Sequence, residues 1–213
     1  MKRFATASAL LGVIGSVGLA VAADLSSLPS PWQHQDIGAV EVKGSASEAN
    51  GVFTLQGTLD IWGNSDGCHY AWKPHKGDIL IIARVLSVEN TQGHAKGGLA
   101  IRESLSADSR HVTMVDTPAD GTQFLIREES GGKTTVQRTS LNKGTMPYWI
   151  KLVRAGDTFS GFESVDGKSW TQTGTTTLKL PESIHVGLVA SSHVKDKLCT
   201  VKLDQVSISK DAK

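Results

Sequence analysis

The chain has 213 residues, a formal net charge of +1 and 20% charged residues. A nucleic-acid-binding protein needs a strongly basic surface and a polyanion mimic needs a strongly acidic one, so this composition excludes both classes. The two cysteines and the scattered histidines include no pair at the spacing of zinc ligands, so they predict no zinc site.

The N-terminal segment predicts export. Two basic residues, Lys2 and Arg3, precede an apolar run that ends in small residues at Ala22. This pattern is typical of a secretory signal peptide, so residues 1–22 are predicted to be removed and residues 23–213 to form one mature domain, secreted or periplasmic. A membrane anchor is the alternative, but the apolar core is short and interrupted by Gly and Ser, and no later stretch is long enough to span a bilayer.

Short segments with strand-like patterns follow one another along the rest of the chain, separated by turn signals about every eight to twelve residues. They are residues 32–38, 43–47, 52–56, 59–62, 69–72, 78–88, 97–103, 111–116, 122–128, 134–139, 149–154, 158–164, 175–180, 185–190 and 198–209. Helical periodicity is almost absent, and at most a single turn is expected near residues 106–108 or 181–183. The pattern therefore predicts an all-β sandwich.

Two stretches organise the predicted sheets. Residues 149–154 and 158–164 alternate apolar and polar side chains on either side of a short turn, which indicates an antiparallel hairpin. Alternation turns Ile150 toward a second sheet and Trp149 away from it. Residues 78–88 form a near-continuous β-branched run, which predicts a central strand that is buried on both faces. The preceding strand, residues 69–72, is expected to end at Pro74.

The hairpin also carries a resemblance. The pattern W-x-K-L-x-R-x-G-x-x-F-x-G-x-x-S-x-D-G-x-x-W over residues 149–170 resembles the bacterial branch of the concanavalin A-like lectin/glucanase superfamily, and more narrowly an uncharacterised family of laminin G-like domains in secreted bacterial proteins. Other matching pieces are residues 60–63, 96–104, 111–114 and 186–193. The resemblance covers most of residues 32–208 and implies a two-sheet antiparallel jelly-roll sandwich, without settling activity.

Aromatic and polar side chains are concentrated in one part of the sequence. Carbohydrate binding uses flat aromatic faces against sugar C–H groups, together with planar polar groups that hydrogen-bond hydroxyl pairs. The side chains of these types are Asp60, Trp62, Asn64, Asp66, His69, Tyr70 and Trp72. The alternative is that both tryptophans fill the core and the polar residues shape a turn.

The same loop offers hard oxygen donors for calcium, namely Asp60, Asn64 and Asp66. The spacing does not fit an EF-hand, because Trp62 occupies a ligand position. Calcium is therefore a possible cofactor supported mainly by its frequency in related sandwich folds, and no other cofactor is predicted.

Arg102 and Arg127 form a second candidate group. They are predicted to lie on neighbouring strands and to face the same way, where they either line a glycan-binding groove or form an ion-pair ladder across a solvated sheet. His69 and His193 each flank a loop or strand end, which makes them the histidines of most interest.

A glycosidase needs two carboxyl groups on opposite sides of the scissile bond. The E-x-D-x-x-E arrangement of glucanases in this superfamily does not occur, and the candidate acids Glu103, Asp116, Glu128 and Glu163 are isolated in the sequence. Motifs of serine hydrolases, zinc proteases, P-loop enzymes and dinucleotide-binding enzymes do not occur either.

Cys68 and Cys199 are the two cysteines. In an exported protein they are compatible with a disulfide, and equally with two buried thiols, because spacing alone does not define their geometry.

The leading hypothesis is a secreted, lectin-like module that binds a polysaccharide or glycoconjugate without cleaving it. The expected stacking residues are Trp62, Tyr70, Trp72 and Trp149, and the expected hydrogen-bonding residues are Asp66, His69, Arg102 and Arg127. The alternatives are a structural or protein-interaction module of the cell envelope, and a glycan-cleaving enzyme with an unrecognised carboxylate pair.

Overall fold

The computed structural model describes Met1, residues 27–139 and residues 141–210. Apart from Met1, the expected signal peptide lies outside the described residues. The regular elements in this part of the chain are all β-strands. It contains no helix of the length and apolarity that crossing a membrane requires. The all-β class predicted from the strand pattern is confirmed.

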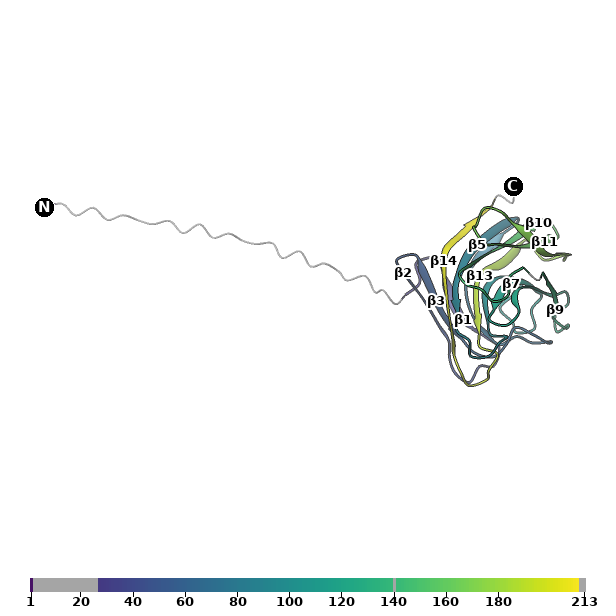
Figure 1. The fold of residues 1–213 in the computed structure, drawn as a ribbon, viewed down its shortest axis with the longest axis horizontal. Coiled ribbons are helices and arrows are strands. Elements are labelled where there is room, and N and C mark those ends of the chain that lie inside the picture. Colours follow the sequence, from purple (N-terminus) through teal and green to yellow (C-terminus); the bar gives the residue numbers. More distant parts are fainter. Residues whose placement is uncertain (2–26, 140, 211–213) are drawn as a thin grey trace.

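The strands form two sheets of seven. Sheet A contains, in spatial order, β1 (Gln33–Ile37), β4 (Cys68–Lys76), β13 (Ser183–Ser191), β6 (Lys96–Arg102), β7 (His111–Thr117), β8 (Gly121–Arg127) and β9 (Thr135–Arg138). Sheet B contains β12 (Thr171–Thr177), β11 (Thr158–Ser164), β10 (Tyr148–Ala155), β5 (Ile79–Val88), β14 (Cys199–Ser209), β3 (Val52–Gly57) and β2 (Ser45–Ala49). The sheets stack as two layers (Figure 1), which gives the predicted antiparallel jelly-roll sandwich.

The main core lies between the two sheets, because successive side chains of a strand point to opposite faces. Ile150 and Leu152 of β10 are fully buried in it, together with Leu99 and Ile101 of β6. The predicted hairpin is confirmed as β10 and β11. Its turn contains Gly156 at a φ of 62°, a conformation that glycine adopts without strain.

Strand β5 is central in sheet B, as expected, but the prediction that both its faces are buried was wrong. Ile79 and Ile81 are fully buried, whereas Leu80 and Ile82 on the opposite face are half-buried. Lys151 of β10 lies opposite Ile82 on this outer face. Long basic side chains cover apolar surface with their methylene groups, so a β-branched run persists on a face that no second layer covers.

Three strand boundaries also differ from the predictions. Residues 59–62 form a loop, because Leu59 has a φ of 58°, which breaks an extended strand. Strand β4 continues through Pro74, which is tolerated because β1 pairs with β4 only up to Trp72 and leaves one side of the strand open. Strand β12 covers Thr171–Thr177 rather than residues 175–180.

A second apolar cluster lies on the outer face of sheet A. Tyr70, Val115, Leu125 and Val189 of this sheet are fully buried there, although no third sheet exists in the described chain. The loops that follow β3 and β6 cover them, with Ile61 buried in the same cluster. Much of the sheet face on which we expected sugar-binding aromatics is therefore closed by loops.

Candidate functional site

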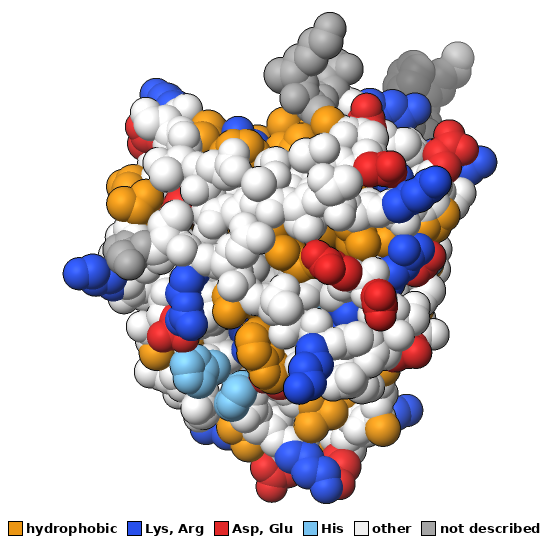
Figure 2. All heavy atoms as spheres, turned by 90° about the vertical axis from the view of Figure 1, so that its right-hand side faces the viewer, with side chains coloured by type: hydrophobic (Ala, Val, Ile, Leu, Met, Phe, Trp, Pro, Cys, Tyr) orange, Lys and Arg blue, Asp and Glu red, His pale blue; other side chains and the backbone are white. Residues whose placement is uncertain are grey.

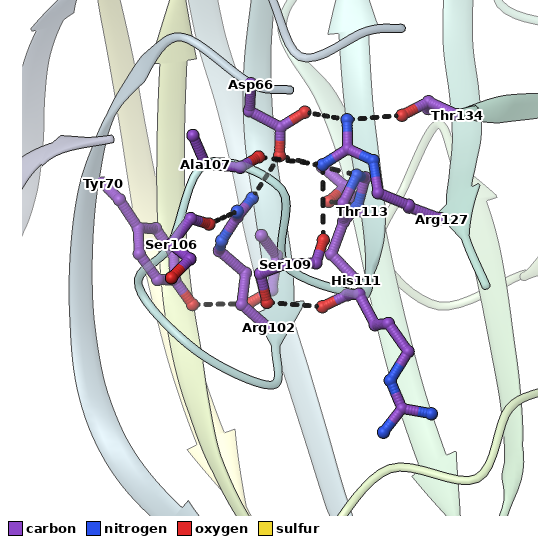
Figure 3. A network of polar contacts seen from close by, with 12 residues as sticks. Asp66, Tyr70, Arg102, Ser106, Ala107, Ser109, His111, Thr113, Arg127 and Thr134 are labelled. Atoms are coloured by element: carbon purple, nitrogen blue, oxygen red, sulfur yellow. Dashed lines mark hydrogen bonds and ion pairs between the residues drawn. The ribbon is translucent and has the colours of Figure 1, made fainter. Parts of the chain in front are cut away.

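A buried ion-pair cluster holds these loops on sheet A (Figure 3). Asp66, in the loop before β4, accepts a hydrogen bond from Arg102 of β6 on one carboxylate oxygen and from Arg127 of β8 on the other, each at 2.6 Å. All three side chains are almost completely buried. The two arginines face the same way, as predicted, but β7 lies between their strands, and the expected solvated ladder is instead a closed cluster.

The ionisable side chains of this cluster differ in their charge state. Burial lowers the pKa of His111 to about 3, so this ring is neutral near pH 7 although its Nε2 lies 3.7 Å from Asp66. Burial disfavours the charged form of Asp66, but the positive charges of Arg102 and Arg127 and the hydrogen bond from Arg127 outweigh it and lower the pKa of the carboxyl. Two guanidinium groups therefore share one carboxylate inside the protein.

The two arginines also donate to the hydroxyl of Thr134 and to backbone carbonyl groups of the covering loops. Arg127 donates to the carbonyl oxygens of Gly63, Ala107 and Gly132 at 3.0–3.1 Å, and Arg102 donates to that of Ser106 at 2.7 Å. The loops that contain Gly63, Ala107 and Gly132, which are far apart in the sequence, are thus all hydrogen-bonded to Arg127. The loop that carries Trp62 is held in place by this cluster.

Next to the cluster, a pocket of about 240 Å³ opens on the outer side of sheet A. It is lined by Asp60, Trp62, His94, Lys96, Asp120, Gln123, Val136, Arg138 and His193. On the face drawn in Figure 2, two histidine side chains lie next to each other beside a hydrophobic side chain, with acidic and basic groups around them. The lining combines one exposed aromatic ring with several hydrogen-bonding groups.

Two carboxylates organise the polar wall of this pocket. Asp60 accepts a hydrogen bond from Lys96 at 2.5 Å and lies 2.9 Å from Nδ1 of His193. Asp120 lies 3.1 Å from Arg138 and 3.2 Å from His94. These pairs hold the polar side chains in defined orientations while leaving Arg138 and His94 about half exposed, at 49% and 46%.

Trp62 is the predicted stacking residue that the structure places in the pocket. Its side chain is 44% exposed, the highest value for any aromatic residue in the described ranges. Tyr70 is fully buried and donates its hydroxyl to the carbonyl oxygens of Ala100 and His185, and Trp72 is 8% exposed. Tyr70 and Trp72 therefore present no open ring face to a ligand and belong to the apolar cluster on the outer face of sheet A. Burial was the alternative stated for Trp72, whereas the prediction that Tyr70 stacks on a sugar was wrong.

Two other predicted residues lie apart from the pocket. His69 is buried in β4 and bonded to Asp36 at 2.7 Å and to His34 at 3.0 Å, and burial lowers its pKa. Trp149 is half-buried in sheet B, with Arg84 5.7 Å from its ring centre.

Asp66, Arg102 and Arg127 do not line the pocket either. They are too buried to touch a ligand, so their role is to position the loops.

The possible calcium ligands do not converge. Asp60 is held by Lys96 and His193, Asn64 donates to the carbonyl oxygen of Gly131 at 2.7 Å, and both oxygens of Asp66 bind arginines. Within residues 27–139 and 141–210, no group of three or more His, Cys, Asp or Glu side chains is placed to hold a metal ion.

Of the four candidate catalytic acids, two lie apart and two, Asp116 and Glu163, are buried near each other. Glu103 pairs with Arg110, and Glu128 is exposed. Asp116 is fully buried, and burial raises its pKa to about 7, with a further contribution from nearby Glu163, which is itself almost completely buried. None of the four lines the pocket beside Trp62.

Cys68 and Cys199 are both buried free thiols. Cys68 belongs to the cluster on the outer face of sheet A, whereas Cys199 lies in the core between the sheets, where its thiol donates to the carbonyl oxygen of Glu89. Burial raises the pKa of both thiols to about 12. Of the two possibilities left open by the sequence, the structure contains the buried thiols.

Several pocket residues were not among the predicted site residues. They are His94, Lys96, Asp120, Gln123, Val136 and Arg138. Two of them could have been found from strand alternation, because side chains at even spacing share a face of the strand. Lys96 lies an even number of positions from Arg102, and Gln123 lies an even number of positions from Arg127. The turn residues His94 and Asp120 carry no such signal.

No protein-family model matches the sequence, and no curated protein matches it. Solved structures do match. A functionally unknown protein from Saccharomyces cerevisiae aligns with a TM-score of 0.65 and 14% identity, over 85% of this chain and 98% of that one. A prokaryotic β-1,3-1,4-glucanase (lichenase) from a mouse hindgut metagenome aligns with a TM-score of 0.56 and 10% identity, over 88% and 97%.

The carbohydrate-binding module CBM66 from Bacillus subtilis aligns with a TM-score of 0.50 and 14% identity, over 84% of this chain and 94% of the module. At such low identity these likenesses show the jelly-roll fold alone. Membership of a particular secreted bacterial family stays a prediction.

Proposed function

We propose that the pocket beside Trp62 binds a carbohydrate without cleaving it. The observation that carries this proposal is the half-exposed indole ring of Trp62 at the edge of a pocket whose wall contains ordered carboxylate, amide and guanidinium groups. A sugar presents C–H groups on its ring faces and hydroxyl pairs at its edges. The aromatic ring can stack against the C–H groups, and the polar wall can hydrogen-bond the hydroxyl pairs.

The pocket is small and shallow. Its volume of about 240 Å³ is below the 300–1,000 Å³ of typical drug-sized ligand sites. It therefore accommodates only a short part of a glycan chain, and little polar surface is desolvated on binding. We expect a dissociation constant on the order of micromolar to millimolar for a single site.

Two further observations support this function. The solved structures of similar fold include a carbohydrate-binding module and a glucanase, which are proteins that contact glycans. The N-terminal pattern around Lys2, Arg3 and Ala22 predicts export to a compartment where polysaccharides are found. We propose that the mature protein, residues 23–213, acts outside the cytoplasm.

The test is a glycan array followed by affinity electrophoresis of the mature protein with soluble polysaccharides. Trp62→Ala should abolish retardation by any polysaccharide that binds the wild type. Trp149→Ala is the matched control, because it removes a half-buried tryptophan from the opposite sheet. Loss of binding in Trp149→Ala with full binding in Trp62→Ala would move the site to sheet B and refute the proposal.

A protein-interaction module is a second candidate. The outer face of sheet B carries half-buried Trp149, Phe162 and Trp170, and Lys151 lies 4.5 Å from the Phe162 ring centre and 4.4 Å from that of Trp170. Aromatic residues and arginine are enriched at protein interfaces, and Arg84 lies 5.7 Å from the ring centre of Trp149 on this face. Retention of a partner protein that is lost in Trp170→Ala, together with no glycan binding, would favour this function.

The glycan-cleaving alternative has a direct test of its own. The acids that line the pocket, Asp60 and Asp120, are each held by two basic side chains. Reducing-sugar release from a bound polysaccharide that disappears in Asp60→Asn or Asp120→Asn would show that the site is catalytic. We expect no release.

A further inference from the structure

Each of the two histidines of the pocket has a carboxylate beside Nδ1, an outer partner that histidine metal ligands commonly have. His94 Nδ1 lies 3.2 Å from Asp120, and His193 Nδ1 lies 2.9 Å from Asp60. A carboxylate at Nδ1 favours the proton on that nitrogen and leaves the lone pair on Nε2. Neither Nε2 makes a hydrogen bond to the described part of the chain.

The separation of the two rings fits a shared ion. Two imidazoles that bind one metal ion through Nε2, with bonds of about 2.1 Å and a tetrahedral angle, have ring centres about 5 Å apart. The ring centroids of His94 and His193 are 5.4 Å apart, and the planes are tilted by 59°. His94 comes from the loop before β6 and His193 from the loop after β13, so the fold brings them together from distant parts of the sequence.

We propose that His94 and His193 together bind one divalent transition-metal ion, Zn²⁺ or Cu²⁺, at the pocket. Imidazole nitrogen suits these ions, whereas Ca²⁺ and Mg²⁺ require oxygen ligands. The protein supplies two ligands, and water completes the coordination sphere. Both histidine side chains are accessible, at 46% and 35% exposure, so the ion enters from solvent without opening the fold.

Asp120 is a positioning residue in this site. It acts through His94, because it holds the ring in the tautomer whose Nε2 is free to bind the metal. The proposal does not depend on carbohydrate binding, since it is tested with metal alone.

The experiment is isothermal titration of the mature protein, expressed without a histidine tag, with Zn²⁺ and in parallel with Ca²⁺. We expect one Zn²⁺ per chain and no Ca²⁺. His94→Ala and His193→Ala should each weaken Zn²⁺ binding at least tenfold, and Asp120→Asn should weaken it about 10–100-fold. His75→Ala is the control, because its Nε2 bonds to the carbonyl oxygen of Asp78, and it should bind like the wild type.

Two results would overturn the proposal: no Zn²⁺ binding by the wild type at millimolar concentration, or Zn²⁺ binding by His94→Ala and His193→Ala equal to that of the wild type. Circular dichroism of each variant confirms that it is folded. Either result leaves the carbohydrate proposal standing, because polysaccharide binding is measured separately.

Discussion

Asp66→Asn tests the buried cluster on which the pocket is built. The substitution keeps the shape of the side chain but removes the carboxylate charge that faces Arg102 and Arg127, each at 2.6 Å. Because both guanidinium groups are fully buried, they are left without a counter-ion. Removing one partner of a buried ion pair costs about 3–5 kcal/mol. For a domain of this size that loss lowers the melting temperature by roughly 10 °C.

The assay is urea and thermal unfolding followed by circular dichroism. The control is Asp204→Asn, which breaks an Arg–Asp pair of similar length on the outside of sheet B, between Asp204 and Arg84 at 2.5 Å. A partly exposed pair contributes little, so this variant should remain close to the wild type. Equal losses of stability in Asp66→Asn and Asp204→Asn would show that the central cluster does not hold the loops.

Two further predictions concern stability. Burial raises the pKa of Asp116 to about 7, whereas an unfolded aspartate has a pKa of about 3.9. Between these two values the folded protein retains a proton that the unfolded chain releases. The free energy of unfolding therefore falls as pH rises from about 4 to 7. Asp116→Asn should remove that loss, so that urea unfolding shows a gain over the wild type that grows toward pH 7; a gain that is the same at both ends of this range would contradict the assignment. Gly98→Ala places a Cβ 2.1 Å from the carbonyl oxygen of Met114 in the next strand, so we expect a loss of about 3 kcal/mol or more, and a much smaller loss for Gly93→Ala, whose Cβ meets only a methyl group at 2.9 Å. Similar unfolding midpoints for the two glycine variants would be inconsistent with this packing.

The architecture could be predicted because it follows from local patterns. Alternation in residues 149–154 and 158–164 identified the central hairpin, and a turn with Gly156 at positive φ joins its strands. The prediction failed where tertiary packing decides burial. Nothing in the sequence around Leu59 indicates a positive φ. Nothing in residues 78–88 shows that one face of β5 is covered only by side chains of a neighbouring strand and not by a second sheet.

The site was predicted only in part for a similar reason. Composition pointed to the loop before β4, from which Trp62 reaches the pocket, but it could not separate an aromatic ring that loops cover from one that they expose. Tyr70 and Trp72 belong to the cluster that the loops after β3 and β6 cover, whereas the first of these loops carries Trp62 to the surface. The polar residues of the pocket come from four loops or turns and three strands, and their convergence depends on the order of strands in sheet A.

The chain contains five tryptophans, so the indole N–H resonances of the mature protein provide the most direct test of the proposed site. A ¹H–¹⁵N spectrum is recorded while a bound oligosaccharide is titrated, and Trp62→Phe assigns one of the resonances. We predict that the Trp62 resonance shifts with saturation while those of Trp149 and Trp170 do not. A saturable shift of Trp149 or Trp170 with no change at Trp62 would contradict the assignment of the pocket as the carbohydrate site.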